Sequence, residues 1–73
     1  MRLPSFTPKR LLRVLKQAGF VVDHQSGSHV VLRHPNGRRA VIPLHNRDLK
    51  RGTLHGIIKQ AGYTLEDFLE LLK

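Results

Sequence analysis

Two closely spaced turn signals constrain the fold of this 73-residue chain more than any other feature. The first occupies residues 25–28 and ends in Gly27-Ser28, and the second is Pro35-Asn36-Gly37. Each lies between short runs rich in Val, Leu and Ile, and short runs joined by such turns form antiparallel hairpins. The sequence therefore predicts three strands, over residues 20–24, 29–34 and 39–43, in an antiparallel meander.

Side chains alternate between the two faces of a strand, which assigns each residue of these runs to a face. The predicted core face carries Phe20, Val22, Val30, Leu32, Ala40 and Ile42. The opposite face carries His29, Val31, Arg33, Arg39 and Val41. We therefore expect His29 to lie in the open beside arginine side chains.

A helix is predicted over residues 7–18, before the first strand. Thr7 is a good N-cap, and Pro8 falls at the first helical position, where no N–H is needed. Gly19 follows as a left-handed helix stop. Apolar residues recur at helical spacing between these two ends, so one face of the helix is expected to join the core.

Two more helices are predicted after the strands. Thr53 is expected to cap the first of them, and Thr64 a short C-terminal one. The run Lys-Gln-Ala-Gly followed by an aromatic residue occurs at 16–20 and again at 59–63, and both copies are typical helix ends. The prediction is a single α+β domain over residues 1–73, with helices packed on one face of a three-stranded antiparallel sheet.

The charge of the chain indicates its partners. The formal net charge is +8, and residues 1–63 hold 12 of the 13 Lys and Arg residues but only Asp23 and Asp48 among the acids. Such an excess favours a polyanion, above all nucleic acid. No apolar run approaches the roughly 20 residues of a membrane helix, and there is no cysteine. We expect a cytoplasmic protein with no membrane contact.

Basic side chains line the predicted first helix. Lys9, Arg13 and Lys16 share one face of it, and Arg10 flanks them. Cations in the first turn oppose the helix dipole, so stability alone would favour acids there. Together with Arg33 and Arg39 of the sheet, these residues are the predicted phosphate contacts.

His29 is the candidate catalytic residue, since it follows the Gly27-Ser28 turn and shares a face with Arg33. Cleaving RNA needs a base for the ribose 2′-OH, an acid for the leaving oxygen and positive charge on the phosphate, and imidazole exchanges protons near neutral pH. Gly27 and Ser28 are expected to support His29. Ser28 and His45 are the candidates for a second proton-transfer group. No metal site and no cofactor are predicted.

These motifs, taken in order, resemble the HicA family. They are the Lys-Gln-Ala-Gly-Phe run, Gly27-Ser28-His29 opening a strand, a Val-Ile-Pro strand end, His45, and Gly52-Thr53-Leu54 before a second Lys-Gln-Ala-Gly run. The resemblance implies an α-β-β-β-α fold like that of a double-stranded-RNA-binding domain. It also implies a toxin that cleaves mRNA, with His29 as the catalytic histidine, neutralised by a HicB-type antitoxin.

Two other functions are compatible with the same residues. A non-catalytic double-stranded-RNA-binding module would use the basic surface to recognise the shape of RNA. An adaptor would use the same charge to hold an acidic protein. Cleavage of RNA by the purified protein would distinguish the ribonuclease hypothesis from both of these alternatives.

Overall fold

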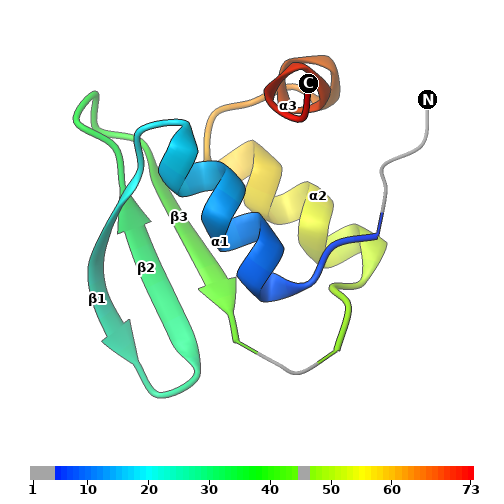
Figure 1. Ribbon diagram of the computed structural model, residues 1–73. Helices are drawn as coiled ribbons and strands as arrows, with labels where there is room; N and C mark the ends of the chain where they lie inside the picture. The colour runs from blue at the N-terminus through cyan, green and yellow to red at the C-terminus, as the bar shows by residue number, and fades with distance from the viewer. Residues whose placement is uncertain (1–4, 45–46) are drawn as a thin grey trace.

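The computed structural model describes residues 5–44 and 47–73. The chain forms α1 (Pro8–Gln17), β1 (Val21–Ser26), β2 (His29–Arg33), β3 (Arg39–Pro43), α2 (Arg51–Gln60) and α3 (Leu65–Leu71). The strands make one antiparallel sheet in the order β1-β2-β3. Helices α1 and α2 pack against β3, and α3 packs against α2, so one layer of helices covers one face of the sheet (Figure 1). The predicted α+β architecture is confirmed.

The hydrophobic core lies between this helix layer and the sheet. Val30, Leu32, Ala40 and Ile42 supply the sheet side, as the alternation predicts. The helix side and the connections supply the remaining core residues, which are Phe6, Leu11, Leu15, Phe20, Leu54, Ile57, Ile58, Ala61 and Phe68. This core fixes which face of the sheet stays available for function.

The sequence-based assignment of Val22 to the core was wrong. Val22 faces the helix side opposite Leu32, but 45% of its surface is exposed. The helices pack over β3, and every residue of β1 is exposed. The edge strand therefore extends beyond the helix layer, and alternation alone could not reveal that offset. The first strand also begins at Val21, because Phe20 still belongs to the helix end.

Local signals set two of the three helix starts. The hydroxyl of Thr7 accepts a hydrogen bond from the Arg10 N–H at 3.2 Å, and that of Thr64 accepts one from the Asp67 N–H at 3.1 Å. The predicted cap at Thr53 was wrong. Helix α2 begins at Arg51 with Lys50 as its N-cap residue and no side-chain capping bond. Thr53 instead lies within the first turn.

The recurring Lys-Gln-Ala-Gly run has a structural explanation, because both copies dock on the β2–β3 hairpin. At the end of α1, Nε2 of His34 lies 3.3 Å from the carbonyl oxygen of Ala18. Nδ1 of His34 accepts the Asn36 N–H at 3.2 Å, so Nε2 carries the proton and donates to Ala18. At the end of α2, Nη1 of Arg38 donates to the carbonyl oxygen of Ala61 at 3.0 Å. One hairpin thus caps the C-terminal ends of both helices.

Candidate active site

The face of the sheet away from the helices carries the residues predicted to act on RNA. Arg33 and Arg39 are directly opposite each other on β2 and β3, and both are exposed. His29 lies on the same face at the start of β2, and is exposed as well. The structure therefore brings His29, Arg33 and Arg39 to one surface, which we call the open face.

The middle of the open face is less open than the sequence suggested. Val31 lies between His24 on β1 and Val41 on β3, and only 5% of its surface is exposed. His24 and Val41 flank Val31 on the two neighbouring strands, and the alternation along a single strand does not predict this burial. The result is an apolar floor with imidazole and guanidinium groups around it.

Backbone contacts hold His29 in position. The turn before it consists of two residues, Gly27 and Ser28, and Gly27 has φ +57°, the arrangement expected when glycine is the first residue of a tight hairpin turn. The carbonyl of Ser28 accepts the Leu44 N–H at 2.5 Å, which ties this turn to the end of β3. Ser26 and Pro43 are the direct cross-strand neighbours of His29. Gly27 and Ser28 are thus the turn residues that lead into β2 and fix the backbone at its start.

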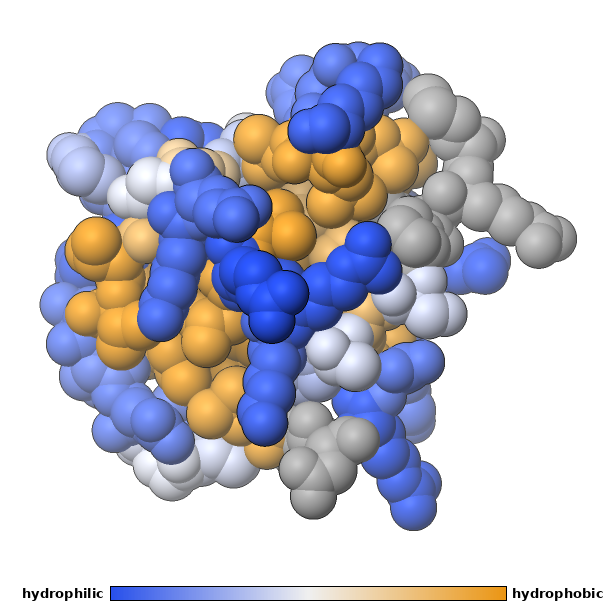
Figure 2. Space-filling view, viewed as in Figure 1, coloured by the Kyte–Doolittle hydropathy of each residue, from blue (hydrophilic) through white to orange (hydrophobic). Residues whose placement is uncertain are grey.

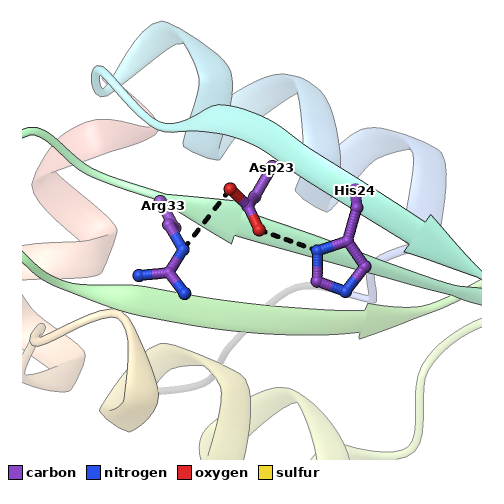
Figure 3. Close-up of polar contacts among 3 residues, drawn as sticks. All are labelled: Asp23, His24 and Arg33. Atoms are coloured by element: carbon purple, nitrogen blue, oxygen red, sulfur yellow. Dashed lines mark hydrogen bonds and ion pairs between the residues drawn. The ribbon is translucent and has the colours of Figure 1, made fainter.

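A second polar cluster lies on β1, and the sequence did not predict it. The strand register shifts between Val22 and His24, so Asp23 is an extra residue in β1. Its carboxylate lies 2.7 Å from Nδ1 of His24 and 3.5 Å from Nε of Arg33 (Figure 3). Strict alternation would put Asp23 and His24 on opposite faces. The shift turns His24 to the open face, where it joins Asp23.

The partners of Asp23 alter its ionisation. The hydrogen bond to His24 contributes most and the charge of Arg33 adds to it, so the pKa of the Asp23 carboxyl lies below its usual value of 3.8. The carboxylate is therefore ionised at neutral pH and acts as an acceptor for both neighbours. The only sign of this cluster in the sequence is that Asp23 is one of just two acids in residues 1–63.

The basic residues of α1 form a separate surface. Lys9, Arg13 and Lys16 are exposed and surround a shallow hollow with Leu12 and Gln17. Because α1 belongs to the helix layer, this surface and His29 are on opposite sides of the sheet. Figure 2 shows hydrophilic side chains across the middle of the helix layer, between one apolar area over the first two strands and another next to α3. Lys16, one of the predicted phosphate contacts, is therefore not on the open face.

Arg10 differs from its neighbours on α1. Its guanidinium carbon lies 4.6 Å from the centre of the Phe6 ring, and Nη1 lies 3.5 Å from the carbonyl oxygen of Ser5. These contacts place the side chain over the core residue that precedes the helix. Arg10 therefore packs over the core and does not line the hollow formed by Lys9, Arg13 and Lys16.

The remaining histidines are distributed over other parts of the fold. The side chain of His34 hydrogen-bonds to the carbonyl oxygen of Ala18 at the end of α1, and His55 is exposed on α2. His45, a candidate for the second proton-transfer group, lies outside the described residues.

Within residues 5–44 and 47–73, no three His, Cys, Asp or Glu side chains lie close enough together to bind a metal ion. Over the same part of the chain, no helix is long and apolar enough to span a membrane.

Comparison with known proteins identifies the family. The family described as HicA toxin of bacterial toxin–antitoxin matches residues 8–63. The chain belongs to the HicA toxin family. The HicA match runs from the start of α1 to the end of α2, and so includes the open face and the basic hollow but not α3. No curated protein matches the chain.

Proposed function

We propose that this HicA toxin is an endoribonuclease that cleaves mRNA, with His29 as an acid–base catalyst. The observation that carries the proposal is the exposed position of His29 at the start of β2, on the same face as Arg33 and Arg39. An exposed imidazole that follows a tight turn and shares a face with two guanidinium groups suits a reaction at a phosphodiester.

The chemistry follows from what each group can do. The imidazole of His29 removes the proton from a ribose 2′-OH, and the 2′-oxygen attacks the adjacent phosphorus. Negative charge grows on the phosphoryl oxygens, and guanidinium groups stabilise it through charged, bidentate hydrogen bonds. Arg33 and Arg39 face each other across two strands, where like charges repel, and a bound phosphate relieves that repulsion. The leaving 5′-oxygen needs a proton from a second group.

The charge of the protein supports an extended RNA substrate. At +8 the chain attracts polyanions from a distance, and Lys9, Arg13 and Lys16 offer a second basic surface. A single strand that passes from the open face around the sheet edge would contact both surfaces. The scissile phosphate then lies on the open face and the flanking phosphates on α1.

The proposed partner in the cell is a HicB-type antitoxin. A protein that neutralises this toxin has to cover the open face, and acidic side chains complement its arginines. We place both proteins in the cytoplasm, where mRNA is available. The proposed reaction uses side chains alone and requires no metal ion.

The test is an RNA cleavage assay on purified protein with a chelator present. The wild type should cut RNA, and His29→Ala should abolish cutting while its thermal unfolding stays unchanged. His55→Ala is the matched control, since it removes an exposed imidazole from the helix layer, and it should cut normally. Equal cutting by His29→Ala and wild type would refute the role of His29. RNA that is bound but left intact by the wild type would favour the double-stranded-RNA-binding module.

A further inference from the structure

We propose that His24, positioned by Asp23, is the second proton-transfer group and protonates the leaving 5′-oxygen. This inference rests on the proposed ribonuclease activity, whose other proton-transfer group is His29. It assigns a function to the cluster of Asp23, His24 and Arg33 (Figure 3).

Strand register places the two histidines next to each other. His24 is opposite Val31, and His29 is two residues before Val31 on β2. They are therefore diagonal cross-strand neighbours on one face, and such residues lie about 7–8 Å apart, with their Cβ atoms somewhat closer. In an in-line displacement the attacking and leaving oxygens are on opposite sides of phosphorus. Two imidazoles at this spacing can each reach one oxygen of a phosphodiester bound between them.

The contact with Asp23 selects the nitrogen of His24 that faces the substrate. An ionised carboxylate only accepts hydrogen bonds, so Nδ1 of His24, at 2.7 Å, is the donor. When His24 is the imidazolium, the form that can act as an acid, its second and labile proton is on Nε2, at the far side of the ring. The His24 side chain is 54% exposed and that of Asp23 37% exposed, so the imidazole is oriented yet open to a ligand. Asp23 is accordingly a positioning residue.

Arg33 is the third member of the cluster and extends it toward Arg39. Its Nε is 3.5 Å from Asp23, and it is directly opposite Arg39. The charged and titratable groups that face His24 from the three strands are Asp23, His29, Arg33 and Arg39. Cations dominate this set, which favours an anionic ligand between the two histidines.

The proton and bond changes balance without another reactant. His29 takes the 2′-OH proton as the bond from 2′-oxygen to phosphorus forms. The bond from phosphorus to the 5′-oxygen breaks, and His24 gives its Nε2 proton to that oxygen. The products are a 2′,3′-cyclic phosphate and a 5′-OH. Exchange with water then returns a proton to His24 and removes one from His29.

The role of an acid at the leaving group can be tested with a substrate that does not need one. An RNA oligonucleotide is first cut with the wild type to map a cleavage site. The same oligonucleotide is then made with sulfur in place of the 5′-oxygen at that site, because a thiolate leaves without protonation. His24→Ala, Asp23→Asn, His29→Ala and the control His55→Ala are assayed on both substrates. Exposed ion pairs add little stability, so these variants should fold.

The proposal predicts a distinct pattern across the variants. His24→Ala should cut the ordinary RNA about 10²–10³-fold more slowly than wild type, yet cut the sulfur substrate within about tenfold of it. Asp23→Asn should show a smaller loss that the sulfur substrate also restores. His29→Ala should be slow on both substrates, and His55→Ala should match the wild type.

Other results would overturn the inference. Normal cutting of ordinary RNA by His24→Ala would exclude His24 from the reaction. A loss of the same size on both substrates would assign His24 a structural or binding role instead. If the wild type cuts neither substrate, the ribonuclease proposal itself fails, and this inference fails with it.

Discussion

Replacing Gly62, which follows the C-terminal end of α2, by alanine is predicted to lower the free energy of unfolding, because the added Cβ would collide with Arg38. Gly62 has φ +85°, and a Cβ there would lie 2.5 Å from Cδ of Arg38. Arg38 is not free to move away without loss. It donates to Ala61, and its guanidinium carbon lies 4.9 Å from the ring centre of Tyr63 and 5.4 Å from that of Phe20.

The cost has two parts that can be separated. A left-handed backbone costs a non-glycine residue about 1–2 kcal/mol. Displacing Arg38 adds the loss of a hydrogen bond from a charged donor, about 1.5–3 kcal/mol. Gly37 is the matched control, because its φ is +95° but a Cβ there meets nothing within 4 Å. Gly62→Ala should therefore be about 2 kcal/mol less stable than Gly37→Ala, a difference of about 8–16 °C in melting temperature.

Thermal unfolding followed by circular dichroism measures this difference. A double-mutant cycle then identifies its source, since contacting residues couple and separate ones add. In an Arg38→Ala background the excess cost of Gly62→Ala over Gly37→Ala should disappear. Equal melting temperatures for the two glycine variants in the wild-type background would refute the argument, as would an excess that persists without Arg38.

Three further predictions concern single side chains. Thr64→Ala should lower the free energy of unfolding by about 1 kcal/mol through loss of the cap, whereas Thr53→Ala should change it by less than about 0.5 kcal/mol, as chemical denaturation can show. The partners of Asp23 hold the pKa of its carboxyl below 3.8 in the folded protein. The carboxylate therefore stabilises the fold above pH 3.8 and loses this effect as the pH falls through the folded-state pKa. The stability difference between wild type and Asp23→Asn should therefore narrow in acid, and a constant difference would contradict the ion pairing. Lys16→Ala should reduce the magnitude of the logarithmic salt slope of RNA binding by about 0.7 if this residue neutralises one phosphate, and an unchanged slope would remove it from the interface.

The candidate site was predictable where a local rule applied to it. His29, Arg33 and Arg39 share a face because side chains alternate along paired strands, and the register confirms this. The position of His24 was not predictable by the same rule, which assigns Asp23 to the open face but His24 to the core face. A register shift after Val22 places His24 on the open face with Asp23, and such a shift depends on how β1 pairs with β2 rather than on the β1 sequence.

The sequence by itself determined the features that act over a few residues. The capping hydroxyls of Thr7 and Thr64, the left-handed stops at Gly19 and Gly62 and the strand order all follow from neighbours along the chain. The net charge of +8, and with it the preference for a polyanion, is likewise a property of composition.

Only the tertiary structure decided how these elements are offset from one another. Helices α1 and α2 pack over β3, which leaves Val22 exposed, and one hairpin caps both helix ends through His34 and Arg38. The basic hollow on α1 and the open face are on opposite sides of the sheet for the same reason. Such offsets depend on packing between residues far apart in the chain, and a local pattern contains no information about that packing.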